Sequence, residues 1–187
     1  MSDRFIFTPT VLSGVFAVRR NPRHDTRGYL ERLFAPEDFS FASLGGSIQQ
    51  INHTLTRQVG AVRGLHFQNL LHAETKLVTC LRGEVFDVAV DLRKDSPTFL
   101  QWHGEILSSK NFTSLLIPEG FAHGFQALSD DCELLYLHSA SYCQEAEGGI
   151  SPTELRIGIR WPREITELSP RDASHPPLDI TFSGLTV

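Results

Sequence analysis

One short stretch of the sequence, from Val62 to Gln68, holds residue types suited to acid–base chemistry on an anionic substrate. His66 can act as a base near neutral pH because the imidazole titrates there, and Arg63 can bind a phosphate group through paired hydrogen bonds. On a regular β-strand, these two side chains would point to opposite faces. A joint role therefore needs a bulge or bend, and Gly64 between them is suited to one.

Partners for such a base are present, but they are distant in sequence. A metal-free acid–base site also needs a carboxylate that orients the base and a proton donor on the other side of the substrate. The candidates are the imidazole of His123, the loop carboxylates of Asp25 and Asp172, and the phenols of Tyr136 and Tyr142. Each of them, taken singly, is more often a packed or surface residue, so residue types alone leave the assignment open.

Three cations form a candidate anion site. Arg27, Arg63 and Lys76 each lie beside a glycine turn or at the start of an expected strand. An arginine guanidinium matches the geometry of phosphate oxygens. The alternative for each is a solvated surface charge, as for most arginines.

Other kinds of active site are disfavoured. A cupin metal site commonly has two histidines two residues apart, but Gly64 and Gln68 occupy those positions around His66. His123 matches only the second half of such a pattern, so no bound metal is expected. The chain also lacks the Gly-x-Ser-x-Gly motif of hydrolases and the glycine-rich phosphate loops of nucleotide-binding proteins.

Many short β-strands must position these residues, since helical periodicity is nearly absent. Turn residues separate apolar, β-branched segments at roughly 8–12-residue spacing, which predicts a β-sandwich or barrel. Ala35–Phe39 is expected to form a short helical turn with proline at its start. The expected strands are one or two within residues 1–20, then Tyr29–Phe34, Ile48–Leu55, Val59–Gln68, Lys76–Leu81, Glu84–Arg93, Phe99–Leu107, Ser114–Ile117, Phe125–Leu128, Cys132–Ala140 and Glu154–Ile159.

Length and composition favour a single domain over residues 1–187, with a barrel core at about 45–140 and a C-terminal tail wrapped on the surface. The net charge of −5 argues against a general nucleic-acid binder. No apolar run is long enough to span a membrane, and Met1–Arg4 lacks a signal pattern. The three cysteines have no metal-binding spacing and cannot all pair, so a reducing cytoplasm is expected.

The sequence resembles a known family, the dTDP-4-dehydrorhamnose 3,5-epimerases and related nucleotide-sugar 3,5-epimerases. The similarity runs from about Asp25 to about Asp172, with its segments in family order. These segments are Asp25-x-Arg27-Gly28, Gln50-x-Asn52-His53, Val62–Gln68, Lys76–Val78, Gly83–Arg93, Ser96–Phe99, Pro118–Phe125, Leu135-Tyr136, Ile159-x-Trp161-Pro162 and Leu168-Ser169-x-x-Asp172. No single segment is specific, but the ordered set is.

The resemblance implies an all-β, jelly-roll (cupin-like) barrel with short peripheral helices, needing no metal or cofactor and usually forming a homodimer. The substrate would be a nucleotide-diphosphate 4-keto-6-deoxysugar, most simply dTDP-4-dehydro-6-deoxyglucose, inverted at carbon 3, carbon 5 or both. The ketone at carbon 4 acidifies both neighbouring carbons, so one base can serve both in turn. Nucleic acid and membrane are not expected as partners.

The resemblance also implies roles for individual residues. His66 would be the base, Asp172 the carboxylate that orients it, and Tyr136 the acid on the opposite face. Lys76 and His123 would stabilise the enolate oxygen, where charge develops in the transition state. Contacts to the diphosphate and nucleotide would come from Arg27, Gln50, Asn52 and Arg63, with Tyr142 stacking on the nucleotide base.

The chain departs from the usual family pattern at three places. This chain has Ile51 where the family usually has aspartate, Arg32 where it usually has glutamate, and Thr153-Glu154 where it usually has Asn-Asp. They bear on the sugar, the nucleotide and the number of inverted centres. Two alternatives remain: a non-catalytic nucleotide-sugar binding module, for which a paired base and acid would be superfluous, and a metal-dependent cupin enzyme, which metal analysis would reveal.

Overall fold

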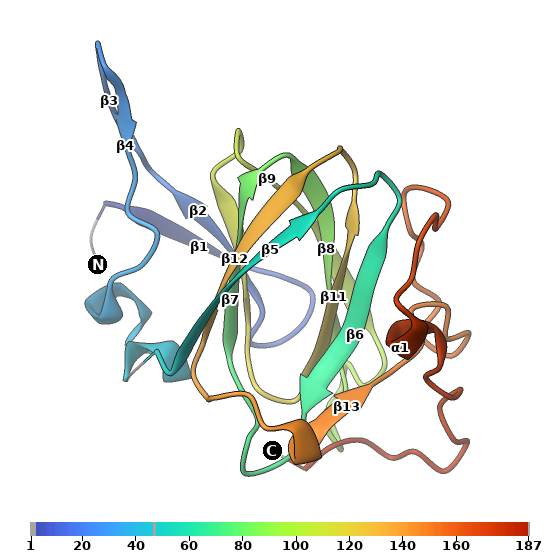
Figure 1. Ribbon diagram of the computed structural model, residues 1–187. Helices are drawn as coiled ribbons and strands as arrows, with labels where there is room; N and C mark the ends of the chain where they lie inside the picture. Colours follow the sequence, from blue (N-terminus) through green and yellow to red (C-terminus); the bar gives the residue numbers. More distant parts are fainter. Residues whose placement is uncertain (1–2, 47, 187) are drawn as a thin grey trace.

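The computed structural model describes residues 3–46 and 48–186, so Met1, Ser2, Ser47 and Val187 lie outside the described residues. Two antiparallel sheets pack face to face as a jelly roll (Figure 1). The six-stranded sheet has the spatial order β1 (Phe5–Pro9), β2 (Phe16–Arg20), β10 (Thr113–Ile117), β7 (Lys76–Arg82), β12 (Cys132–His138) and β5 (Gln50–Thr56). The five-stranded sheet has the order β13 (Glu147–Gly149), β6 (Val62–Gln68), β11 (Phe121–Ala127), β8 (Glu84–Asp91) and β9 (Trp102–Ser108).

The main core lies between the sheets, because their facing strands alternate apolar side chains inward. Its members come from both sheets and include Val78, Val85, Leu115, Phe125 and Leu134, each almost fully buried. The expected all-β, cupin-like class is confirmed.

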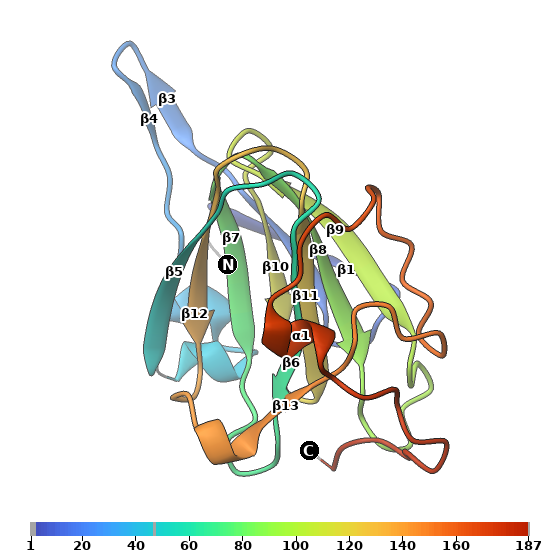
Figure 2. The same ribbon diagram turned by 45° about the vertical axis from the view of Figure 1, so that its right-hand side comes forward.

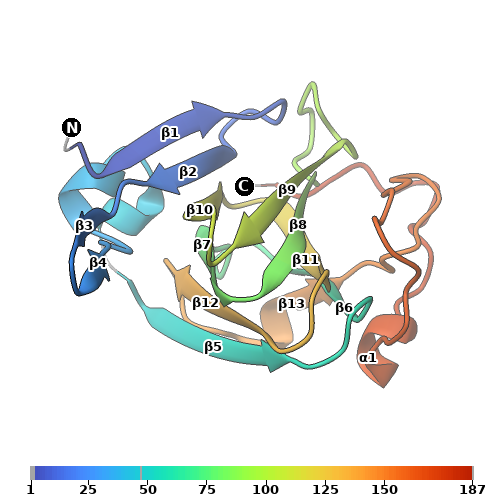
Figure 3. The same cartoon turned by 90° about the horizontal axis from the view of Figure 1, so that it is seen from above.

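Two further apolar clusters cover the outer faces of the sheets. The N-terminal 3₁₀ helices η1 (Pro36–Phe39) and η2 (Ser43–Gly45) pack Phe39 and Leu44 against the six-stranded sheet. The C-terminal tail packs Ile157, Trp161 and Phe182 against the five-stranded sheet. Figure 3 shows these two coverings on opposite sides of the barrel. The tail therefore wraps the surface, as expected, and carries the helix α1 (Pro170–Ala173) to the edge of β6 (Figure 2).

A two-stranded hairpin, β3 (Arg23–Asp25) with β4 (Gly28–Leu30), projects from the barrel (Figures 1 and 2). Its base is held to the six-stranded sheet by Arg20, whose guanidinium is 2.7 Å from a carboxylate oxygen of Glu31 and also donates to Ser114. No helix among the described residues combines the length and apolar character needed to cross a bilayer.

Several expected boundaries were wrong. The strand predicted at Tyr29–Phe34 ends at Leu30, and the segment Asn21–Gly28, predicted as a turn, contains β3. β11 begins at Phe121, four residues earlier than expected, which brings His123 onto a strand. Glu154–Ile159 is not a strand.

The last error has a physical explanation. The backbone N–H of Arg156 donates to the Glu154 carboxylate at 2.9 Å, which closes a turn, and the backbone N–H of Leu178, farther along the tail, donates to the other oxygen at 2.8 Å. Ile157 and Ile159 then pack on the outer face of the five-stranded sheet, so their apolar spacing reflects packing of a loop.

Candidate active site

A cavity of about 800 Å³ opens between the two sheets. Its walls come from β5, β6, β7, β11 and β12, and the segment containing α1 forms part of its rim. Eight of the ten site residues predicted from the sequence line it. They are His66, Lys76, His123, Tyr136, Asp172, Asn52, Arg63 and Tyr142.

The expected distortion of β6 at Gly64 is present. His123 of β11 pairs with His66, but Phe125, two residues later, pairs with Arg63, three residues earlier. β6 therefore contains one extra residue, and a β-bulge of this kind reverses the alternation of side chains. Arg63 and His66 consequently face the same cavity, as a joint role requires.

Only glycine fits at the bulge. Gly64 has φ of +125°, and a Cβ there would lie 2.6 Å from the Cα of Gly124 on β11. The peptide bond that follows, to Leu65, is cis. The backbones of β6 and β11 thus approach closely at a pair of glycines, and a side chain at position 64 would push them apart.

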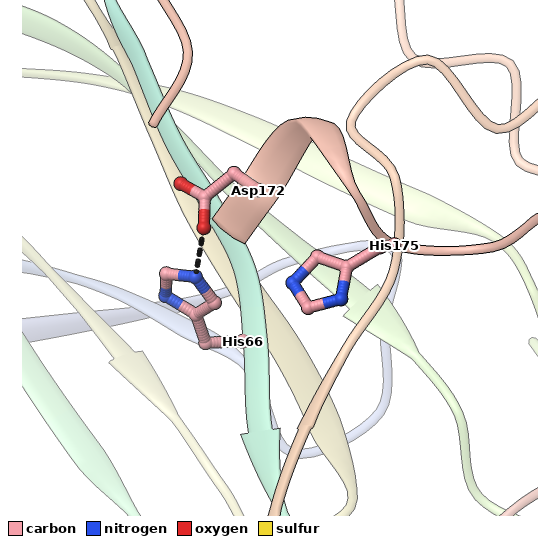
Figure 4. Close-up of side chains that lie close together, drawn as sticks. All are labelled: His66, Asp172 and His175. Atoms are coloured by element: carbon pink, nitrogen blue, oxygen red, sulfur yellow. Dashed lines mark hydrogen bonds and ion pairs between the residues drawn. The ribbon is translucent and has the colours of Figure 1, made fainter. Parts of the chain in front are cut away.

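His66 and Asp172 form a hydrogen-bonded pair at the cavity wall (Figure 4). The Nε2 of His66 lies 2.7 Å from Oδ1 of Asp172, and the backbone N–H of Gly64 donates to the other oxygen at 3.1 Å. Asp172 is itself placed by α1, since its backbone N–H donates to the helix cap Ser169 at 3.1 Å. The bulge and the short helix therefore position the pair together.

The carboxylate determines which nitrogen of His66 carries the proton. Burial alone would raise the pKa of Asp172, but hydrogen bonds from His66 and Gly64 and nearby positive charge lower it to about 2. An ionised carboxylate only accepts hydrogen bonds, so Nε2 of His66 must donate its N–H. Nδ1 then carries the lone pair, and Figure 4 shows that nitrogen turned away from Asp172. The ring is thus oriented to act as a base at Nδ1.

Tyr136 lies on β12, in the sheet opposite His66. Burial and the nearby charge of Asp87 raise its pKa above the usual value, so the phenol keeps its proton at neutral pH. His123 packs edge-on against the Tyr136 ring, with centroids 5.9 Å apart, and is itself 2.8 Å from a carboxylate oxygen of Asp87. A protonated phenol therefore faces an imidazole base across the cavity.

Lys76 is the buried cation of this wall. Its side chain is 8% exposed, and its ammonium group lies 3.2 Å from a carboxylate oxygen of Glu74 and 3.4 Å from the carbonyl oxygen of His66. A buried ammonium can stabilise negative charge strongly because little water screens it.

The rim carries positive charge that is not neutralised by a carboxylate in the way that Lys76 is. Arg63 donates to the Thr56 hydroxyl at 2.9 Å and the Leu55 carbonyl oxygen at 3.2 Å, and within the described chain it makes no ion pair. Arg57 also lines the cavity. A guanidinium held by neutral groups keeps its charge available for an anion.

Gln50 lies just behind the lining residues. Its side-chain amide donates to Asn52 at 3.1 Å, and its oxygen accepts the backbone N–H of Tyr142 at 2.9 Å. The Tyr142 phenol in turn donates to Glu147, at 3.1 Å. Gln50 therefore holds two residues that reach the cavity.

Arg27 and Asp25 are not brought to this cavity. Both lie on the projecting hairpin, where the Arg27 guanidinium is 2.6 Å from Asp25 and its side chain is 88% exposed. Within one chain, Asp25 therefore serves the hairpin rather than His66, and the role predicted for Arg27 stays a prediction.

His175 forms a cluster with His66 and Asp172, and their potential ligand atoms all lie within 4.8 Å of one another (Figure 4). The Arg171 guanidinium lies 2.9 Å from Nε2 of His66. Since that nitrogen donates to Asp172 and a guanidinium only donates, this is a close approach of positive charge and not a hydrogen bond. A divalent cation at this point would be repelled by the Arg171 guanidinium, and both Asp172 oxygens already accept hydrogen bonds. The arrangement suits acid–base chemistry better than metal binding.

Comparison with known proteins places this geometry in a family. The family model for dTDP-4-dehydrorhamnose 3,5-epimerase matches residues 9–179. The chain belongs to the dTDP-4-dehydrorhamnose 3,5-epimerase family. As a member, it is an isomerase, and the resemblance inferred from its motifs is confirmed.

Individual relatives agree with this family assignment. The chain is 42% identical to the dTDP-4-dehydrorhamnose 3,5-epimerase of Salmonella typhimurium, over 93% of this chain and 96% of the relative. It is 38% identical to a dTDP-4-dehydrorhamnose 3-epimerase of Streptomyces niveus, over 88% and 79%. The structure of a Legionella pneumophila 3,5-epimerase in complex with dTDP-4-keto-L-rhamnose superimposes with a TM-score of 0.87 at 36% identity, covering 95% and 94%.

Sequence reasoning missed several residues that line the cavity. His138 lies two residues from the predicted Tyr136 on β12, so strand alternation would have placed it on the same wall, whereas Glu74 lies in the loop before β7. Arg171 is next to the predicted Asp172, but only the turn of α1 brings it to the cavity. The alternation of side chains along a strand could thus have indicated only the cavity residues that lie on strands.

Proposed function

We propose that this protein epimerises a nucleotide-linked 4-keto-6-deoxysugar, with dTDP-4-dehydro-6-deoxyglucose as the first candidate substrate. The observation that carries the proposal is the placement of an imidazole, His66, and a protonated phenol, Tyr136, on opposite sheets around one cavity. Inversion needs a proton removed from one face of a carbon and returned to the other. A base and an acid on facing walls meet that need.

The first step is proton removal. Nδ1 of His66 takes the proton from the carbon next to the ketone, and the carbon–hydrogen electron pair moves into the carbonyl group to give an enolate. Asp172 holds the resulting imidazolium. The Lys76 ammonium and His123 stabilise the enolate oxygen, and one such preorganised donor contributes about 3–4 kcal/mol.

The second step is proton return. Tyr136 gives its phenolic proton to the opposite face of the carbon, and the enolate collapses to the ketone. Solvent then reprotonates the phenolate and takes the proton from the imidazolium. Repeating the cycle at the other carbon inverts the second centre, because both carbons are acidified by the same ketone.

Substrate binding would use the rim. Arg63, with its charge unneutralised, is suited to the diphosphate, and Asn52 and Gln50 offer amides to the sugar or nucleotide. Tyr142, about half exposed at the mouth, is suited to stacking on the nucleotide base.

We further propose that the protein is a homodimer acting in the cytoplasm. Among the described residues, the edge strand β5 has no neighbouring strand on its outer side, and it exposes Ile51 (61%) and Leu55 (39%), so a second copy could cover it. Arg27, remote from its own cavity, could then reach substrate only in the cavity of the partner. The three cysteines are free thiols, which suits a reducing compartment.

The test is a deuterium exchange screen in heavy water across several nucleotide 4-ketosugars. We expect deuterium at carbon 3, carbon 5 or both, with the pattern reporting the number of inverted centres. Binding of these sugars without exchange at either carbon would instead support a non-catalytic binding module. Light scattering of the purified protein reports the oligomeric state.

A further inference from the structure

A further carboxylate–imidazole pair, Glu74 with His138, lies in the cavity wall and has no role in the steps above. Nδ1 of His138 is 2.8 Å from a carboxylate oxygen of Glu74, and both side chains are 10% exposed. Both residues line the cavity. A buried ion-pairing group at an active site is a candidate functional element, since burying it is costly.

The His138 ring is held at both of its nitrogens. Burial would raise the pKa of Glu74, but the hydrogen bond to His138 and the charge of Lys76 lower it, so the carboxylate is ionised and accepts the Nδ1–H. Nε2 then carries the lone pair and faces the amide nitrogen of Asn52 at 3.5 Å. Partners at both nitrogens fix the orientation of an imidazole, as they do for histidines that bind metals.

The fixed ring stacks on Tyr136. The two residues are neighbours on the same face of β12, their ring centroids lie 6.0 Å apart, and their planes differ by 17°. His123 contacts the Tyr136 ring edge-on from β11. The phenol is therefore held between two imidazoles, each anchored by its own carboxylate.

We propose that His138, anchored by Glu74, is a positioning residue for Tyr136, and that it controls the return of the proton rather than its removal. This inference rests on the proposed function. A misplacement of about 1 Å in a reacting group can cost about 10²-fold in rate. Loss of the His138 ring frees one side of the phenol, whereas His66 on the opposite sheet and Asp172 on α1 keep their contacts.

The experiment separates proton removal from proton return with two variants of similar size. His138→Gln can still donate to Glu74 but has no ring, and His138→Phe keeps the ring but cannot donate. Glu74 stays unchanged because it also contacts Lys76. A matched control is His103→Phe, which alters another histidine–carboxylate pair, with Glu105 on β9, away from the cavity.

Each protein is incubated in heavy water with dTDP-4-keto-6-deoxyglucose, and deuterium entry and inverted product are measured together by NMR. We expect His138→Gln to exchange within about threefold of wild type while inverted product falls at least tenfold. His138→Phe should recover inversion to within about threefold, and His103→Phe should match wild type in both.

Three results would overturn the proposal. These are an equal loss of exchange and inversion in His138→Gln, no loss of either, or inversion kept in His138→Gln and lost in His138→Phe. The last would assign the effect to the hydrogen bond with Glu74 rather than to the stacked ring. If wild-type protein shows neither exchange nor inversion, the proposed function fails for that substrate, which is a distinct outcome.

Discussion

Replacing Asp172 by asparagine changes the charge of the site but almost nothing of its shape, and the structure predicts how the amide will orient. The backbone N–H of Gly64 donates to one side-chain oxygen of Asp172 at 3.1 Å, and His66 lies 2.7 Å from the other. In the variant, the single amide oxygen must accept from Gly64, because two N–H groups facing each other would be unpaired. The amide NH₂ then points at His66.

That orientation reverses the tautomer of His66. Facing an N–H donor, Nε2 must carry the lone pair, so the proton moves to Nδ1 and the nitrogen directed at substrate loses its basicity. A general base contributes about 10²–10⁴-fold to the rate. We therefore expect exchange at the sugar carbons to fall by about 10²–10⁴-fold, with little change in substrate binding.

The same substitution lowers stability by a calculable amount. The pKa of Asp172 falls from its ordinary value of 3.8 to about 2 in the folded protein, and its side chain is 3% exposed. A difference of about 1.8 pKa units corresponds to about 2 kcal/mol of folding free energy at neutral pH. We expect the free energy of unfolding in urea at pH 7 to drop by about that amount.

Exchange rates by NMR, substrate affinity by calorimetry and urea unfolding together test this account. Asp179→Asn is the matched control, since Asp179 is exposed in the tail and bonds only local groups and Arg156. Exchange in Asp172→Asn within threefold of wild type would refute the tautomer argument. A large loss of binding would show that Asp172 acts on substrate directly.

The remaining predictions follow from the same contacts. Tyr136→Phe should leave deuterium entry within about threefold of wild type and reduce inverted product about 10²-fold, as measured by NMR; equal losses would make the phenol structural. Lys76→Met should slow deuterium entry and inversion of the sugar carbon alike, by about 10²–10³-fold, because the enolate oxygen loses a hydrogen-bond donor. Mixing inactive Arg27→Ala and His66→Ala proteins should restore activity if Arg27 serves the partner's cavity, and no recovery would exclude that. The stability due to Asp172, whose folded pKa is lowered, is present above about pH 4 and lost as the pH falls to about 2; wild-type and Asp172→Asn unfolding midpoints should therefore converge there.

Sequence reasoning predicted the parts of the fold that depend on local pattern. The strands β7, β8, β10 and β12 follow apolar alternation bounded by turn residues, and their positions were predicted to within a few residues. The bulge in β6 was predicted from chemistry, because Arg63 and His66 could share a cavity if Gly64 broke the alternation; the alternative was an arginine reaching around the rim by its length.

Other features depend on contacts that no local pattern encodes. Pairing of His66 with Asp172 spans 106 residues, and only the family resemblance selected Asp172 over Asp25. The tail at Glu154–Ile159 has strand-like spacing but packs as a loop on an existing sheet. The anchoring of His138 by Glu74 requires knowing that β12 and β7 are neighbours.

Deuterium entry into dTDP-4-keto-6-deoxyglucose, measured side by side for wild-type protein and His66→Ala, tests the central claim most directly. We expect deuterium at carbon 3, carbon 5 or both with the wild type, and none above background with the variant, whose substrate affinity should change little. No deuterium with the wild type would contradict the proposed reaction for this substrate. Unchanged deuterium entry with His66→Ala would contradict the assignment of His66 as the base.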